Sequence, residues 1–101
     1  MDTPRLSHSA ALILKALTLG FCFGLEVMEV TGLPSGTVYP ALRRLERDLL
    51  VDSKWEPESE AIAKQRPARR YYEVTEAGKA AAQSATARYP LLARLAPERS
   101  T

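Results

Sequence analysis

An amphipathic pattern between Ser35 and Leu49 sets the strongest limit on the fold of this chain. Apolar side chains recur there at helical spacing and would lie within about 60° of one another on a helical wheel; they are Val38, Leu42, Leu45 and Leu49. The opposite side is small or cationic and consists of Gly36, Pro40, Arg43 and Arg47, flanked by Tyr39 and Arg44. The pattern predicts a helix with one face in a core and a free basic face, whose first turn Pro40 would bend or delay.

Two further helices are predicted before this one. Residues 7–19 would be capped by Ser7 and ended by Gly20, and their buried stripe would consist of Ala10, Ile13, Leu14 and Leu17. A shorter helix is expected over residues 24–31, with Leu25, Met28 and Val27 on its buried side. The turn residues of segment 32–36 would connect it tightly to the amphipathic helix.

Alternating side chains predict two strands, over residues 50–56 and 69–74. Trp55 and Tyr72 share the inward phase, which makes both candidates for the core. The intervening segment 57–68 is polar apart from Ile62 and is expected to be a long hairpin loop. A last helix would start after Thr75 and reach Tyr89, where Pro90 ends or kinks it. The expected class is mainly α: three helices, a two-stranded β-hairpin and a C-terminal helix.

The composition is more useful for excluding classes of function than for assigning one. With 101 residues and a formal charge of +2, the chain suits one domain and does not by itself imply a polyanionic partner. The lone Cys22 indicates a small buried hydrophobe, and the lone His8 has no nucleophile partner. Acidic Glu56, Glu58 and Glu60 suggest a solvated loop rather than a metal site. An enzyme, a cofactor and a metal are therefore not expected, and without a membrane span or secretory signal the cytoplasm is the expected location.

Basic residues occur on two neighbouring elements. The amphipathic helix has hydroxyls at Ser35 and Thr37 beside its arginines, groups that bind base edges and phosphates. A second basic set, free of acids, lies where the hairpin leaves its loop: Lys64, Arg66, Arg69 and Arg70. Together they favour double-stranded DNA as the partner, with the three glutamates turned away from it. A solvated helix face, or a protein-interaction module without DNA contact, remains the alternative.

Two segments resemble a known family. Residues 32–46 read Gly-Leu-Pro-Ser-Gly-Thr-Val-Tyr-Pro-Ala-Leu-Arg-Arg-Leu-Glu, and residues 67–78 read Pro-Ala-Arg-Arg-Tyr-Tyr-Glu-Val-Thr-Glu-Ala-Gly. Both are similar to signatures of PadR-like transcriptional regulators. The resemblance implies a winged helix-turn-helix fold, a homodimer and repression. It places Ser35, Thr37, Tyr39 and Arg43 on the helix that reads DNA, and Lys64, Arg66 and Arg69 on the wing. The amphipathic pattern adds Gly36, Pro40, Arg44 and Arg47 to the expected DNA-binding residues.

The chain departs from that family's pattern at two places. It has Phe23-Gly24-Leu25 where the family often has His-Gly-Tyr, so contacts of that His or Tyr would be absent. Its C-terminal part is short, so no separate effector domain is expected, and any small-molecule effector would bind at the dimer interface.

The expected division is a DNA-binding domain over residues 1–75 and a dimerisation helix over residues 76–101. The last helix has a stripe of small and then larger apolar residues: Ala77, Ala81, Ser84, Ala85, Leu92 and Leu95. This stripe is expected to form the subunit contact of a homodimer that binds a palindromic operator. The alternative is that the helix docks on its own subunit.

Overall fold

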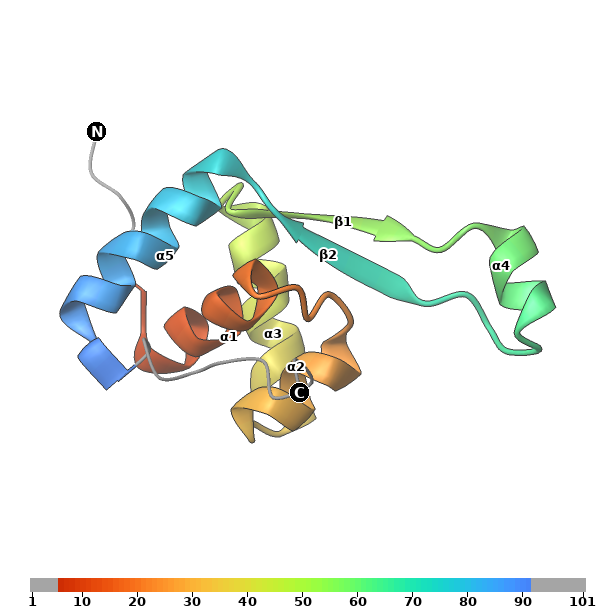
Figure 1. Ribbon diagram of the computed structural model, residues 1–101, viewed down its shortest axis with the longest axis horizontal. Helices are drawn as coiled ribbons and strands as arrows, with labels where there is room; N and C mark the ends of the chain where they lie inside the picture. The colour runs from red at the N-terminus through yellow and green to blue at the C-terminus, as the bar shows by residue number, and fades with distance from the viewer. Residues whose placement is uncertain (1–5, 92–101) are drawn as a thin grey trace.

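The computed structural model of the chain describes residues 6–91, so Leu92 and Leu95 of the expected dimerisation stripe lie outside the described residues. Helices α1, α2, α3 and α5 form one body, and a hairpin extends from it with a short helix, α4, at its tip (Figure 1). The elements in chain order are α1 His8–Thr18, α2 Gly24–Thr31, α3 Ser35–Arg47, β1 Val51–Trp55, α4 Glu58–Ala63, β2 Arg70–Val74 and α5 Glu76–Arg88. The predicted mainly α class is confirmed.

Helix α1 is the centre of the body, because α2, α3 and α5 all pack against it. Ile13 and Leu14 are completely buried. At the start of the helix, the Ser7 hydroxyl accepts a hydrogen bond of 3.1 Å from the Ala10 backbone N–H. Gly20 follows the end of the helix with a φ of 101°, a left-handed conformation that glycine adopts without steric cost. The predicted cap and end of this helix are therefore confirmed.

Helix α2 buries a different side chain from the one expected. Leu25 is 60% exposed, so its assignment to the core is wrong, whereas Val27 is completely buried and Met28 packs partly against the core. Residues two apart on a helix point in nearly opposite directions. A helix of eight residues that buries Val27 therefore turns Leu25 outward.

Helix α3 buries Val38, Leu42 and Leu45 as predicted. Leu49 was assigned to the same stripe, and this is wrong, because the helix ends at Arg47 and Leu49 is 72% exposed with a φ of 64°. The reversal of the chain after the helix brings Leu50 into the core instead. The helix starts at Ser35, so Pro40 lies within it and does not delay its first turn.

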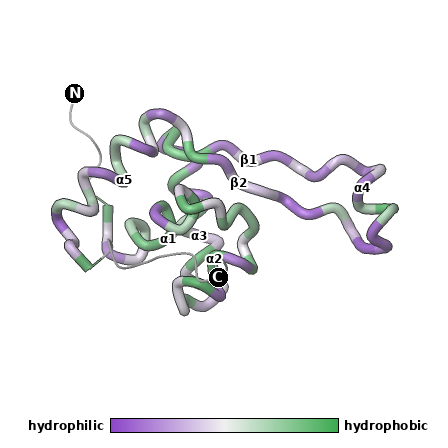
Figure 2. The backbone as a smooth tube through the Cα atoms, viewed as in Figure 1, coloured by the Kyte–Doolittle hydropathy of each residue, from purple (hydrophilic) through white to green (hydrophobic). Residues whose placement is uncertain are grey.

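The hairpin pairs β1 with β2 in antiparallel register, from Val51 opposite Val74 to Trp55 opposite Arg70. The segment before α2 adds to this sheet, because the Tyr72 N–H donates to the Cys22 carbonyl at 2.9 Å. Tyr72 is buried as predicted, but Trp55 is 63% exposed and does not belong to the core. The reason is that the outer end of the hairpin extends beyond the helical body. Figure 2 shows it largely purple to white between the body and α4.

The segment expected to be a loop contains α4. Its buried residue is Ala61, whereas Ile62, the apolar exception in the expected loop, is 68% exposed. Only a small side chain is covered here because α4 lies at the tip of the hairpin, away from the helical body (Figure 1). None of the helices within residues 6–91 has the length and hydropathy of a membrane span.

Helix α5 starts with the predicted cap, since the Thr75 hydroxyl accepts from the Gly78 N–H at 3.0 Å. It packs on α1, and this corrects part of the dimerisation stripe: Ala81 and Ala85 are 1% and 2% exposed within their own chain. Small side chains let two helices approach closely. Of the predicted stripe, Ala77 and Ser84 face outward.

Candidate nucleic-acid interface

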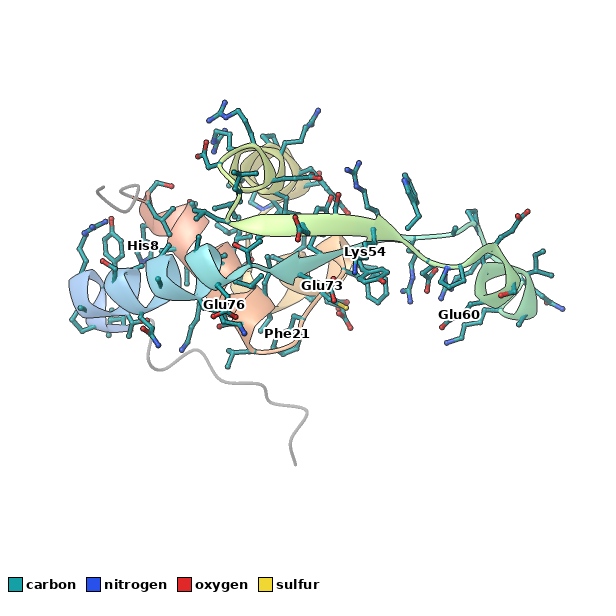
Figure 3. The ribbon with its side chains drawn as sticks, turned by 90° about the horizontal axis from the view of Figure 1, so that it is seen from above. His8, Phe21, Lys54, Glu60, Glu73 and Glu76 are labelled. Carbon is teal, nitrogen blue, oxygen red and sulfur yellow. The ribbon has the colours of Figure 1, made fainter. Side chains whose placement is uncertain are left out.

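The residues predicted on the reading helix share the outer face of α3. Ser35, Gly36, Arg43, Arg44 and Arg47 are exposed, and Thr37 and Pro40 are partly exposed. In Figure 3 nitrogen-tipped side chains project from α3, the olive helix, on the side away from α5. Because the apolar stripe holds the inner face of α3 against the body, these polar groups cannot turn inward. The structure therefore brings all seven together on one surface.

The arginines of this surface differ in their partners. Arg47 Nε lies 3.3 Å from the Asp48 carboxylate, but both side chains are largely exposed, so the pair contributes little. Arg43 and Arg44 form no ion pair with any residue in the described range 6–91. Unpaired guanidinium groups on an exposed helix face are available to a polyanion.

One flank of α3 is joined to the hairpin by a polar network. The Ser53 hydroxyl donates to the Glu46 carboxylate at 2.6 Å, and Arg70 donates to the Ser53 oxygen at 2.9 Å from Nε and 2.7 Å from Nη2. Arg70 Nη2 also lies 3.4 Å from Glu46. Residues from α3, β1 and β2 therefore meet at one point. This network links the reading helix to the hairpin.

A second network closes the segment that contains α4, and its centre is Glu56. The sequence predicts a solvated carboxylate here, but the Glu56 side chain is only 5% exposed. Arg66 donates to both of its carboxylate oxygens, and the Arg69 N–H donates to it at 2.9 Å. These bonds favour the charged form and lower the pKa of Glu56 to about 2, chiefly through Arg66. Glu56 therefore anchors the segment, a role that no sequence signal had marked.

The predicted basic residues of the wing therefore divide by their partners. Lys64 is exposed beyond the end of α4. Arg66 is bound to Glu56 and its side chain is only 25% exposed. Arg69 lies between these cases: its guanidinium stacks 3.8 Å from the centre of the Phe23 ring and 3.6 Å from Glu56, with its side chain 45% exposed. The structure thus leaves less free positive charge on the wing than the sequence predicts.

A cavity of about 300 Å³ lies between α2, α3 and the hairpin. Tyr39 contributes from α3 and packs over Gly24, where a Cβ atom would lie 2.5 Å from the Tyr39 ring. The start of α2 is capped by Glu26, whose carboxylate accepts from the N–H groups of Cys22 and Phe23 at 3.2 and 3.4 Å. This carboxylate makes the start of α2 a poor place for an anion. Tyr39 belongs to α3 and lines the same cavity as residues of β1 and β2, so it lies between the reading face and the hairpin.

The residues considered for other chemistry lie apart. Burial, with a contribution from Glu26, raises the pKa of the Cys22 thiol, which disfavours the reactive thiolate. His8 packs edge-on against Tyr89, with ring centres 5.1 Å apart. Within residues 6–91 no three His, Cys, Asp or Glu side chains are grouped as metal ligands would be.

Comparison with known proteins gives two kinds of match. The model of the transcriptional regulator PadR-like family matches residues 13–84, from α1 into α5. A PadR family transcription regulator from Clostridium difficile R20291 is 24% identical, with a TM-score of 0.71 over 88% of this chain and 94% of that one. A PadR-like transcription factor from Bacteroides fragilis is 23% identical, with a TM-score of 0.67 over 84% of this chain and 82% of that one. No curated protein matches the sequence. The two structures share the winged helix fold.

Proposed function

The chain belongs to the transcriptional regulator PadR-like family, and on that premise we propose that it is a homodimer that binds a palindromic operator in double-stranded DNA and represses transcription. The observation that carries this proposal is the outer face of α3. Its apolar side is buried, and its exposed side presents small residues, hydroxyls and unpaired arginines. A helix of this kind fits the major groove, where side chains reach base edges.

Within this proposal the residues have different roles. Ser35, Thr37, Tyr39 and Arg43 approach base edges and nearby phosphates, while Gly36 and Pro40 allow close approach. Arg44 and Arg47 bind phosphates beside the groove. On the wing, Lys64 and Arg69 bind the backbone, and Arg66 supports them through Glu56. Contacts to phosphate would position the helix without reading sequence.

We propose that dimerisation uses the outward side of the C-terminal segment, from Ala77 and Ser84 onward. A chain of this size buries a limited core, which association of two copies would supplement. Leu91 is 69% exposed at the end of the described residues and is available for such a contact. A twofold axis would space two reading helices about 34–36 Å apart, one turn of DNA. Any small-molecule effector would bind between the subunits, and the protein would act in the cytoplasm, where its operator lies.

The test is a titration of fluorescently labelled duplexes, followed by anisotropy at two salt concentrations. A random duplex pool identifies the operator, and a palindrome is expected. Affinity should fall steeply with salt, by a slope of roughly one power of salt for each phosphate contact. Arg44→Gln should reduce that slope by about one. Lys79→Gln removes a cation of equal charge from α5, where Lys79 pairs with Glu76, and should leave the slope unchanged.

Three results would contradict the proposal. Absence of binding at low salt, or binding that does not depend on salt, would favour a winged helix that binds protein instead. Selected sequences without twofold symmetry would remove the palindromic operator. A single-subunit mass in light scattering across micromolar concentrations would remove the homodimer.

A further inference from the structure

The large aromatic residue Trp55 lies on the side of the hairpin that faces α3. Residues two apart on a strand share a face, so Trp55 shares the face of Ser53, whose hydroxyl bonds to Glu46 on α3. The opposite face carries Lys54 and Glu73, 3.0 Å apart, and Figure 3 shows both on the side of the hairpin away from α3. Trp55 is nevertheless 63% exposed, so packing within the chain does not explain a tryptophan at this position.

Trp55 is one wall of the 300 Å³ cavity beside α3. Leu25, 60% exposed, contributes from α2, and the buried Tyr72 lies deeper in the same cavity. Two exposed apolar side chains therefore border an opening next to the reading face. Their contact with water is unfavourable and would be relieved by an apolar surface placed between them.

Positive charge lies next to these apolar groups. The guanidinium carbon of Arg70 is 5.8 Å from the centre of the Trp55 ring. Its Nε and Nη2 groups bind Ser53, and Nη2 also lies 3.4 Å from the Glu46 carboxylate, whereas Nη1 has no hydrogen-bond partner within residues 6–91. Arg69 borders the same cavity and keeps 45% of its side chain exposed. The carboxylate of Glu26 also lines the cavity, at the start of α2, where it accepts from the N–H groups of Cys22 and Phe23. The site thus combines apolar walls with guanidinium groups on its hairpin side.

We propose that this site holds the sugar–phosphate backbone of one DNA strand, with a deoxyribose between Trp55 and Leu25 and a neighbouring phosphate on Arg70. This rests on the proposed function, because a duplex on the outer face of α3 passes beside this side of the hairpin. A DNA strand alternates apolar sugar faces with anionic phosphates, and the site offers partners for both. The indole N–H, a donor only, adds a hydrogen bond to phosphate.

The chain contains a single tryptophan, so its emission reports on this site without any label. The experiment titrates the full chain with a mixed-sequence duplex at low salt and records tryptophan emission, acrylamide quenching and DNA anisotropy together. Emission is expected to change, and access of acrylamide to fall, with the same midpoint as the anisotropy. If anisotropy shows binding while emission and quenching stay constant, the site is wrong and the DNA-binding function stands. If anisotropy shows no binding, the proposed function fails and this site with it.

Variants measure what the contact contributes. Trp55→Ala should weaken binding roughly tenfold, as expected for a buried aromatic anchor, and Trp55→Phe should weaken it less. The loss should be the same for a selected operator and a mixed duplex, because sugars and phosphates do not differ with sequence. Leu49→Ala removes a similarly exposed apolar side chain, which follows the end of α3 and does not line the cavity, and should leave affinity unchanged. Unchanged affinity of Trp55→Ala, or a loss confined to the operator, would overturn the assignment to the backbone.

Discussion

Arg66 donates hydrogen bonds to both carboxylate oxygens of Glu56, ten residues earlier in the chain. The pair lies at the base of the segment that contains α4, and the Arg69 N–H binds the same carboxylate. One buried acid thereby gathers two of the cations that the sequence predicts at DNA. Its effect is to hold the segment in place, so that the remaining free cations have a defined position.

Glu56 should make stability depend on pH in the acid range. Its pKa is lowered from 4.5 to about 2 in the folded chain, so it stabilises the fold fully above pH 4.5. That contribution is lost as the pH falls through the folded pKa of about 2. Glu56→Gln keeps the shape but removes the charge, and should melt at a lower temperature at neutral pH. The difference in melting temperature between the two proteins should shrink toward pH 2. A difference that does not change with pH would show that charge is not what Glu56 supplies.

Gly78 should not tolerate a side chain. A Cβ atom there would overlap the Leu50 carbonyl oxygen and lie 2.6 Å from Val74 Cγ1. Gly78→Ala should therefore lower the free energy of unfolding by roughly 1–3 kcal/mol in urea denaturation. Gly36 is the matched control, because nothing lies within 4 Å of its Cβ position on α3. Gly36→Ala should instead stabilise by about 0.5–1 kcal/mol. Equal effects of the two substitutions would contradict this account of the α5 contact.

Ala85 should matter within one chain rather than between chains. Since it is buried by the packing of α5 on α1, Ala85→Leu should overfill that contact and destabilise by roughly 1–3 kcal/mol. The loss should not depend on protein concentration. Ala77→Leu enlarges an exposed residue of the same helix and should leave the stability of a single chain unchanged. Denaturation at several concentrations checks both, and a concentration-dependent loss for Ala85→Leu would restore it to a subunit interface.

Arg43 should contribute to DNA affinity without contributing to stability. It is exposed on α3 and forms no ion pair within residues 6–91, so removal leaves no buried partner behind. Arg43→Ala should weaken binding to a selected operator by about 1–3 kcal/mol if it contacts a base edge. The melting temperature should stay as it is. Lys79→Ala, on α5, serves as a control of equal charge and should retain full affinity, since Lys79 forms only an exposed pair with Glu76. An Arg43→Ala protein with unchanged affinity would remove this residue from the reading face.

Much of the fold could be predicted from the sequence because its signals are local. The period of α3 separates Val38, Leu42 and Leu45 from the arginines without knowledge of any neighbour. The caps at Ser7 and Thr75 likewise depend on an N–H three residues away. The α3 part of the candidate site follows from the same period. The wing does not, because the partners of Arg66 and Arg69 depend on how a twelve-residue segment, 57–68, folds back on Glu56.

The residues that share a face of each helix and strand can be identified from the chain alone, because they follow from the geometry of the element. The faces that are covered, and the points where the cover ends, depend on how the elements pack together. Trp55 and Tyr72 share a face, yet Tyr72 lies over the body and Trp55 beyond it. Ala81 and Ala85 have the small side chains of a subunit contact, yet α1 of the same chain covers them. Burial of a face requires a second surface that packs against it, and a periodic pattern does not identify that surface.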